Sequence, residues 1–297
     1  MLGIALMLGF STLAPMGDAV IKILGAMLPA VFFVVSRFAM QAAFLAPIVL
    51  TTKTFKSITP SQYRLILLRT GFHIIGVGSM FMALRHLPLA DAVAIAFVMP
   101  FISLILGKYV LGEDVGLRRL LACCVGFIGT LLVIQPSFVE VGTAALWPLV
   151  TAVAFALFIL VGRQVAQQAD PVAIQMLSGV MAVLILLPLL IIGSQLNWPE
   201  FGLIVPTGKT LWLILLAGFL GTIAHLLMTW SLRYAPSTTL APLTYIEIPI
   251  TTFVGFMVFG DLPNQLAATG ICISVAAGLY IVFREQANAR ASAAETL

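Results

Sequence analysis

The sequence predicts an all-helical membrane protein whose ten transmembrane helices form two inverted five-helix repeats. Three observations lead to this fold class. First, 61% of the 297 residues are hydrophobic and 9% are charged, whereas a soluble domain has roughly 25% charged residues. Second, apolar runs of about 20 residues, each long enough to cross the hydrocarbon core as a helix, recur along the whole chain. Third, a pattern from the first half of the chain returns in the second half.

Ten apolar runs, bounded by charges, prolines and polar turns, are the predicted membrane spans. They lie near residues 3–24, 29–51, 65–85, 88–111, 119–135, 143–165, 171–193, 210–231, 236–260 and 264–283. The first run lacks the basic region of a signal peptide, so we expect it to be retained as a span. The longest outer loop, between the seventh and eighth spans, is too short to form a domain. We therefore expect the function to lie among the helices.

The basic residues of alternate loops predict the orientation of the chain. With ten spans both termini lie on one side, and the side whose short loops carry more Lys and Arg is cytoplasmic. One set of loops holds nine basic residues, and the other holds Lys22, Arg85 and Lys209. We therefore expect a multi-pass protein of the plasma membrane, which is the inner membrane in a bacterium, with both termini in the cytoplasm. Within the spans, Arg69 and Lys108 are expected to snorkel to the inner surface, whereas Arg37 lies too deep.

The repeat is carried by the stretches "MALRHLPLADAVAIAFVMP" and "WSLRYAPSTTLAPLTYIEIP", in which Leu-Arg-x-x-Pro precedes a span interrupted by proline. Three matched features are 148 residues apart: Arg85 and Arg233, Pro88 and Pro236, and Gly112-Glu113 and Gly260-Asp261. Because five spans is an odd number, the second half enters the membrane from the opposite side. Such a repeat can adopt two exchanged conformations, so it favours transport by alternating access over a merely duplicated bundle.

Longer segments of both halves carry a family resemblance. "ALRHLPLADAVAIAFVMPFISLILGKYVLGE" followed by "RRLLACCVGFIGTLLVIQP", and "SLRYAPSTTLAPLTYIEIPITTFVGFMVFGDLP" followed by "GICISVAAGLYIVFRE", resemble the EamA-type ten-helix carriers of the drug/metabolite transporter superfamily. The architecture is similar to that of the YddG-type aromatic amino acid exporters. The resemblance implies EamA-like repeats over residues 1–136 and 143–284, with a short cytoplasmic tail over 285–297. It also implies peripheral fifth and tenth spans, a central cavity among the other eight, and amino acid export, without a motif that fixes the substrate.

Glu247 is the leading candidate for a transport-site residue. It lies near the middle of the ninth span, where a lone carboxylate costs at least about 2.5 kcal/mol unless it is protonated, paired or facing water. Pro242 and Pro249 flank it and, with Pro100 in the fourth span, are expected to break their helices. Glu247 is then either a site for a substrate amine or a proton, or a protonated carboxyl bonded to a neighbouring helix.

Asp18, in the outer half of the first span, is expected to pair with Arg37 of the second span or with Lys22 one turn later. Such a pair is either structural, or a gate or carboxylate-binding site. His73 and His225 lie at depths where titration matters, although hydrogen bonding between helices is the commoner role of a membrane histidine.

Other candidates line the cavity or its outer mouth. Tyr245, Trp230, Phe97 and Phe101 are candidates for an aromatic cavity wall. At the outer mouth lie Arg85, which belongs to the repeat, and His86 and Asp91, which have no counterpart in the second half and are expected to tune substrate entry or gate closure. The cysteines Cys123, Cys124 and Cys272 lack metal-ligand or redox spacing and are expected to be packing residues.

The composition and motifs predict a transporter rather than an enzyme. No HExxH, GxSxG, P-loop or dinucleotide fingerprint occurs, so we expect no catalysis, cofactor or metal. The net charge of +4 is scattered over loops, so a nucleic-acid partner is not expected. The expected partners are the lipid bilayer, a small-molecule substrate and, as a candidate coupling ion, the proton; monomer and homodimer both stay open.

The predicted function is secondary transport by alternating access, with export of aromatic or hydrophobic amino acids, or similar small amphipathic metabolites, favoured. The alternatives are a carrier for another metabolite or drug (a vitamin, a nucleoside-like compound, a polyamine or a cationic drug), a passive channel, and an intramembrane enzyme. The repeat argues against the enzyme, because a catalytic cluster need not recur inverted.

Overall fold

The computed structural model describes residues 2–113, 116–134, 142–260 and 265–295, and every regular element in these ranges is helical. The first half contains α1 (Leu2–Gly25), α2 (Ala30–Thr52), the 3-10 turn η1 (Thr54–Ser57), α3 (Pro60–His86), α4 (Leu89–Ala96), α5 (Met99–Leu111) and α6 (Leu117–Ile134). The second half contains η2 (Gly142–Ala145), α8 (Leu146–Ala166), α9 (Pro171–Gln195), η3 (Pro199–Phe201), α10 (Gly208–Tyr234), α11 (Ser237–Leu240), η4 (Ala241–Ile246), α12 (Glu247–Phe259) and α13 (Gln265–Glu295). Asp261, part of the repeated pattern, lies outside the described residues.

The predicted spans correspond to these helices. Within the described ranges, eight helical segments are long and apolar enough to cross a membrane: α1, α2, α3, α4 with α5, η2 with α8, α9, α10, and the stretch from α11 to α12. The fifth and tenth spans are α6 and α13, whose apolar segments, Leu120–Gly129 and Ala268–Tyr280, are shorter. The all-helical, polytopic fold class is therefore confirmed.

Local sequence signals set the ends of several helices. α3 begins at Pro60 after a capping box, in which the Thr59 hydroxyl accepts from the Gln62 N–H and Gln62 Oε1 accepts from the Thr59 N–H. α5 and α12 are both followed by a glycine with positive φ, Gly112 at +65° and Gly260 at +75°, a conformation that glycine adopts at little cost. The repeated glycines therefore end equivalent helices in the two halves.

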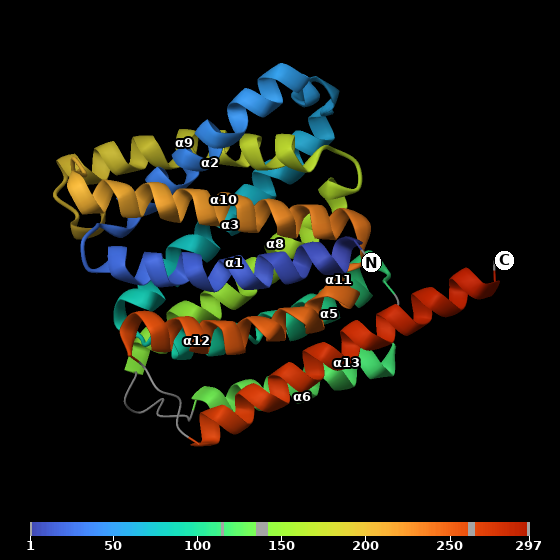
Figure 1. Ribbon diagram of the computed structural model, residues 1–297. Helices are drawn as coiled ribbons and strands as arrows, with labels where there is room; N and C mark the ends of the chain where they lie inside the picture. The colour runs from blue at the N-terminus through green and yellow to red at the C-terminus, as the bar shows by residue number, and fades with distance from the viewer. Residues whose placement is uncertain (1, 114–115, 135–141, 261–264, 296–297) are drawn as a thin grey trace.

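The two halves interleave (Figure 1). α1 packs on α10, α3 on α8, α2 on α9, and α6 on α13. In the repeat, α1 corresponds to α8, α2 to α9, α3 to α10 and α6 to α13. The α1–α10 and α3–α8 pairs are therefore equivalent to each other, and the α2–α9 and α6–α13 pairs each join two equivalent helices. α1 and α10 run in opposite directions, since Gly3 at the start of α1 lies against Ala235 at the end of α10. This is the inverted relation that an odd number of spans predicts.

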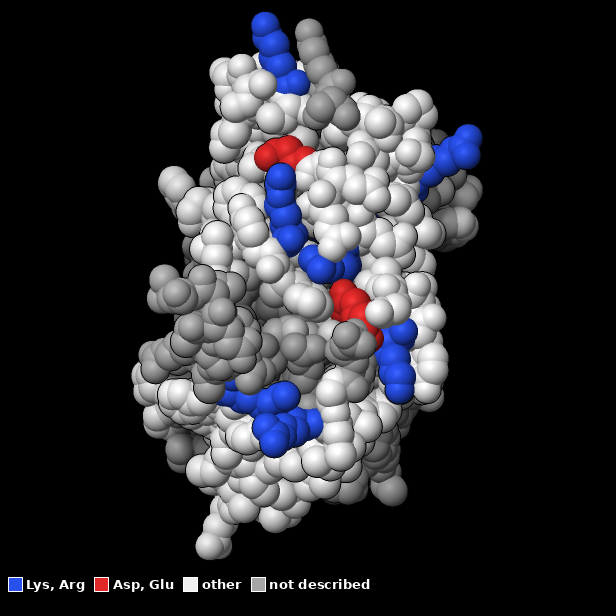
Figure 2. Space-filling model, turned by 90° about the vertical axis from the view of Figure 1, so that its right-hand side faces the viewer, with Lys and Arg blue, Asp and Glu red and all other residues white. Residues whose placement is uncertain are grey.

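The two ends of the bundle are named here by one residue at each. The Arg85 end contains the ends of α1 and α3, and the Glu113 end contains the end of α5 and the start of α11. α1 begins and α13 ends at the Glu113 end (Figure 1). Figure 2 faces this end and shows Lys and Arg side chains spread across it.

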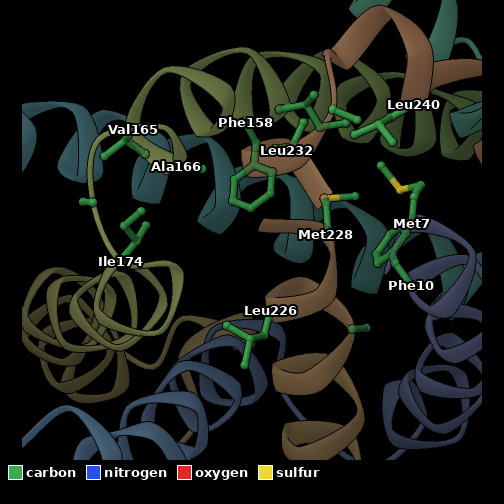
Figure 3. Packing of buried hydrophobic residues seen from close by; sticks show 14 of the residues in the cluster. Met7, Phe10, Phe158, Val165, Ala166, Ile174, Leu226, Met228, Leu232 and Leu240 are labelled. Carbon is green, nitrogen blue, oxygen red and sulfur yellow. The ribbon is translucent and has the colours of Figure 1, made fainter. Parts of the chain in front are cut away.

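A hydrophobic cluster fills the core between the middle of the bundle and the Glu113 end. Figure 3 shows Met7 and Phe10 of α1 close to Met228 and Leu232 of α10 and to Leu240 of α11. None of these side chains is more than 7% exposed. Since α1 begins at the Glu113 end, Met7 and Phe10 lie in its first half, and the cluster separates the centre of the bundle from that end.

Candidate functional site

A cavity lies between the two halves, directly beyond this cluster. On α1 its lining residues run from Phe10 to Ile21, so it occupies the middle of the bundle and the half toward the Arg85 end. The wall is mostly apolar, with the rings of Phe10, Phe97 and Phe155 among its residues. Its polar side chains are Asp18, Arg37, Thr151, His225 and Glu247.

Two interrupted helices contribute to the wall. α4 and α5 are separated by residues 97–98, and Phe97 in this gap lines the cavity. Pro100 is the second residue of α5, and Pro242 is the second residue of the 3-10 segment η4. Pro249 is the third residue of α12, in the first turn, where a missing N–H removes no intrahelical bond. The interruptions therefore precede Pro100 and surround Pro242, while Pro249 lies inside the next helix.

The acidic side of the cavity consists of Asp18 on α1 and Glu247 at the start of α12. The two carboxyl groups are close enough to interact electrostatically, and Glu247 is 8% exposed. Glu247 is the first residue of α12 and follows the 3-10 segment η4 without a break in the chain of helical residues.

The basic side consists of Arg37 on α2 and His225 on α10. Arg37 Nη2 lies 3.3 Å from His225 Nδ1, and Arg37 Nη1 donates to Gln41 Oε1 at 3.1 Å. Arg37 is 2% exposed, so its guanidinium is held inside the bundle at the cavity wall.

The prediction that Asp18 forms an ion pair with Arg37 or Lys22 is wrong. In the described part of the chain Asp18 forms no ion pair, and Lys22 Nζ donates to the Leu87 carbonyl at 2.5 Å. Asp18 and Arg37 lie at comparable depth, but Gln41 and His225 hold the guanidinium on the α2–α10 side of the cavity. Depth along a helix predicts the layer of a side chain, but not the side of the cavity on which it lies.

Arg69 on α3 is a second buried guanidinium, and the expectation that it snorkels to the surface is wrong. It is 0% exposed, and it donates to Ser178 Oγ at 3.2 Å, Gln175 Oε1 at 3.0 Å and Thr229 Oγ1 at 2.8 Å. Its guanidinium carbon lies 4.0 Å from the centre of the Phe158 ring. Acceptors on α9 and α10 take hydrogen bonds from both terminal nitrogens of the guanidinium in the interior, while Nε has no hydrogen-bond partner among the described residues. Sequence reasoning also missed Gln41 and Gln175.

His73 lies behind the basic side of the cavity rather than in its wall. Its ring centroid is 4.5 Å from that of His225 and 4.9 Å from that of Phe38. The side chain is 0% exposed, and neither ring nitrogen has a hydrogen-bond partner among the described residues. The two expected histidines are thus brought together, with His225 between His73 and Arg37.

The structure places one of the four expected aromatic residues, Phe97, in the cavity wall, whereas Phe101 is not among the lining residues. The Tyr245 ring packs against Phe97, with centroids 5.6 Å apart, and against Gly126 of α6 on the side away from the cavity. Trp230 packs on the hydrophobic cluster of the Glu113 half. Three aromatic residues that the sequence did not single out, Phe10, Phe155 and Phe158, surround the cavity and its basic side instead.

At the Arg85 end, Arg85 connects the two halves. Its Nη1 pairs with Glu200 Oε1 of η3 at 2.7 Å, while Nη2 and Nε donate to the carbonyls of Leu28 at 2.6 Å and Gly25 at 3.0 Å. Glu200 Oε2 in turn accepts from the Ala30 N–H at 3.0 Å. These residues form the Arg85 cluster. Of the other expected outer-mouth residues, His86 is exposed and Asp91 is half-buried.

At the other end, Glu113 connects the α5–α6 loop to the second half. Its Oε1 pairs with Arg163 Nε at 3.3 Å and accepts from the Ser237 N–H at 3.2 Å. Its Oε2 accepts from the Ser237 hydroxyl at 2.8 Å and from the Thr238 N–H at 3.0 Å. Arg163 Nη1 also donates to the Leu232 carbonyl. Glu113, Arg163, Ser237 and Thr238 form the Glu113 cluster.

The Glu113 carboxyl is stabilised in its charged form. Burial raises its pKa, but the hydrogen bonds from Thr238 and Ser237 more than offset this, and the pKa lies below its ordinary value of 4.5. Sequence reasoning used Glu113 as a marker of the repeat and did not identify this role, because Ser237 lies 124 residues away.

These features form one cavity between inverted halves, with charged clusters at both ends, and a family comparison identifies the protein class. The family model described as the EamA-like transporter family matches residues 1–135 and 142–284. The chain belongs to the EamA-like transporter family. It is therefore a multi-pass membrane transporter that handles a small-molecule substrate.

Named relatives of this EamA-like protein include carriers of chemically different metabolites. A riboflavin transporter of Rhizobium johnstonii is 29% identical over 73% of this chain and 69% of the relative. An S-adenosylmethionine uptake transporter of Rickettsia felis is 24% identical over 91% of this chain and 88% of the relative. A pseudopaline exporter of Pseudomonas aeruginosa is 27% identical over 66% of this chain and 67% of the relative. A solved crystal structure at 19% identity superposes with a TM-score of 0.70, covering 93% of this chain and 94% of that chain, which shows the fold alone.

Proposed function

We propose that this protein is a secondary transporter that exports amino acids, or similar small zwitterionic metabolites with an aromatic or apolar group, through the central cavity by alternating access. The observation that carries the proposal is that carboxyl groups and a guanidinium from different helices line the same cavity. Asp18 lies on α1 and Glu247 on α12, and Arg37 lies on α2 beside His225 of α10.

This set of groups matches the chemistry of an α-amino acid. The substrate ammonium group is placed against the carboxyl groups of Asp18 and Glu247, and the carboxylate against the Arg37 guanidinium, which favours planar anions. The rings of Phe10, Phe97 and Phe155 then face the apolar part of the substrate.

Alternating access is supported by the contacts at the two ends. The Glu113 cluster and the hydrophobic cluster beneath it join the two halves on one side of the cavity, and the Arg85 cluster joins them on the other. A transport cycle requires these two sets of contacts to break in turn. The Lys and Arg side chains at the Glu113 end (Figure 2) support a cytoplasmic location for that end and for both termini.

A second candidate substrate class is favoured by the relatives. The relatives are named for riboflavin, S-adenosylmethionine and pseudopaline, all of which are larger than a single amino acid. S-adenosylmethionine itself carries an α-ammonium carboxylate. An amino acid group attached to a larger aromatic or nucleoside-like body would use the same charged groups and more of the cavity.

Flux into proteoliposomes tests the proposal. Wild-type protein is assayed with aromatic and aliphatic amino acids, riboflavin, S-adenosylmethionine and polyamines, each with and without a pH gradient. We expect saturable flux of an amino acid or a compound that contains one, and Glu247→Gln is expected to lower flux and to change its dependence on the pH gradient. Thr252→Val is the matched control on the same helix, because its hydroxyl donates only to the Ile248 carbonyl of its own helix.

Two results would contradict the proposal. Absence of saturable flux for every compound with an amino acid group would refute the substrate class. Unchanged flux and unchanged pH dependence in Glu247→Gln would remove this carboxyl group from the transport mechanism and leave the proton without a site at this position.

A further inference from the structure

The basic side of the cavity continues into a buried hydrogen-bond network that holds two cations and no described anion. Arg37 is 2% exposed and Arg69 is 0% exposed. Their hydrogen-bond partners among the described residues are the side chains of Gln41, Gln175, Ser178, Thr229 and His225. All of these partners except the histidine are uncharged at any pH at which the protein functions.

This composition is unusual for a purely structural network. Burying a guanidinium is costly unless a counter-charge and a full set of hydrogen bonds repay the loss of water, and intramembrane cations are commonly paired. Neither Arg37 nor Arg69 has a carboxylate partner in the described part of the chain. The positive charge at this wall is therefore available to a negative group that enters the cavity.

The network also fixes the orientation of each amide. Arg69 Nη2 donates to Gln175 Oε1 at 3.0 Å, so the Gln175 amide nitrogen is turned toward Gln41, whose Oε1 lies 3.4 Å away. Gln41 Nε2 donates to the Gln175 backbone carbonyl at 2.7 Å, which leaves Gln41 Oε1 to accept from Arg37 Nη1 at 3.1 Å. The chain of bonds thus runs from Arg69 through two glutamines to Arg37.

Arg37 is the member of the network that reaches the cavity. A guanidinium has five N–H donors. Arg37 uses one at Nη1 for Gln41, and one at Nη2 for His225 in the tautomer in which His225 Nδ1 is unprotonated; in the other tautomer Nδ1 donates to the Gly221 carbonyl instead. Donors therefore remain for a ligand at the wall. Two parallel N–H groups of a guanidinium match the two oxygens of a carboxylate.

We propose that Arg37 forms a carboxylate subsite in the cavity and that Arg69 is a positioning residue, which acts through Gln175 and Gln41 to orient Arg37 and adds positive potential. The subsite rests on the proposed transport of zwitterions, but it is tested by binding rather than by flux. Arg69 itself does not contact the substrate. It makes the cavity select compounds that carry a carboxylate over the corresponding amines.

Gln41→Glu is the decisive variant. Glutamate has nearly the shape of glutamine, so it retains the acceptor for Arg37 and places a carboxylate within ion-pairing distance of the guanidinium. We expect this internal anion to occupy the subsite. Purified protein is titrated, with thermal stability as the readout, against 3-phenylpropionate, which has a carboxylate and no amine, and phenylethylamine, which has an amine and no carboxylate.

The expected result is a loss of about tenfold or more in affinity for 3-phenylpropionate, with affinity for phenylethylamine unchanged or increased. Arg69→Met is expected to lower the affinity for 3-phenylpropionate but not that for phenylethylamine. Arg69→Lys is expected to retain part of the affinity for 3-phenylpropionate that Arg69→Met loses. Thr70→Val is the matched control on the same helix, because the buried Thr70 hydroxyl donates to the Ile66 carbonyl of its own helix and takes no part in the network. If Arg69→Met does not fold, Gln41→Glu decides alone.

Three outcomes would overturn the subsite: no binding of 3-phenylpropionate to the wild type, an unchanged preference for it in Gln41→Glu, or an equal loss for both probes, which is what a merely structural network would give. Failure of the transport proposal looks different. In that case no amino acid shows flux, while the wild type still prefers the carboxylate probe and Gln41→Glu abolishes the preference.

Discussion

Glu113→Gln is expected to open the Glu113 end of the transporter. The carboxylate accepts hydrogen bonds from the Ser237 N–H, the Ser237 hydroxyl and the Thr238 N–H, and it pairs with Arg163. A glutamine keeps one oxygen, so at least the two bonds to Oε2 lose their acceptor, and the charge opposite Arg163 disappears. The Glu113 and Arg163 side chains are 11% and 14% exposed, so water replaces little of what is lost.

The size of the effect follows from these contacts. A hydrogen bond to a charged group contributes about 1.5–3 kcal/mol, so partial loss of two such bonds costs the closed state about 2–4 kcal/mol. At about 1.4 kcal/mol per factor of ten, the opening equilibrium shifts by roughly 30- to 700-fold.

Cysteine accessibility measures this shift. Ser103 is 3% exposed and lies with Met7, Ile159 and Ser237 around a small pocket between the main cavity and the start of α11. In a background without native cysteines, Ser103→Cys is labelled with a maleimide, alone and with Glu113→Gln. The labelling rate is expected to rise in proportion to the open population. Glu200→Gln, which removes the carboxylate at the opposite end, is the matched control and should not accelerate labelling. A rate unchanged by Glu113→Gln would refute the role of this cluster in closure.

Three further predictions concern pH and packing. The pKa of Glu113 is depressed in the closed state, so its contribution to closure is complete above its ordinary value and is lost as the pH falls through the depressed value. The labelling rate, divided at each pH by that of a fully exposed reference cysteine to remove the pH dependence of the thiolate, should be constant from about pH 8 to about pH 5 and rise only below that. A rise nearer neutrality would contradict this assignment. Gly221→Ala places a Cβ against the Arg37 guanidinium, so it should lower the free energy of unfolding by about 1–3 kcal/mol and weaken binding of the carboxylate probe. Gly78→Ala is the control and should do neither, because its Cβ would meet nothing closer than 3.8 Å. Gly126→Ala places a Cβ 2.5 Å from the tyrosine ring of η4 and should lower the melting temperature of the purified protein without changing the preference for the carboxylate probe; an unchanged melting temperature would show that α6 moves aside freely.

Several candidate residues could be predicted because their chemistry is costly wherever they lie in a membrane. A carboxylate or guanidinium in the middle of an apolar run needs a reason to be there, and this rule alone selected Asp18, Arg37 and Glu247. The structure places all three in one cavity wall. The same rule holds for Arg69. Its position close to the expected membrane surface suggested that the side chain reaches water, whereas it is fully buried.

The partners of these residues could not be predicted from the chain. Arg69 reaches Gln175 and Thr229, which are 106 and 160 residues away, and no local pattern connects positions on α3, α9 and α10. The expected Asp18–Arg37 pair failed for the same reason, since depth follows from the sequence but the rotation of one helix about another does not. Aromatic residues carried even less information, because rings pack equally well in a cavity wall or against a neighbouring helix.

The sequence by itself determined that the chain is a helical membrane protein with ten spans and inverted halves. These properties depend on the length of apolar runs and on repeated residues, both of which are local and are read directly from the order of amino acids. The tertiary structure decided how the halves interleave, that acidic and basic groups from different helices line one cavity, and that Glu113 and Arg85 join the halves at opposite ends. Those features depend on which faces of ten similar apolar helices pack together, and each face is chosen by the fit of all the helices at once.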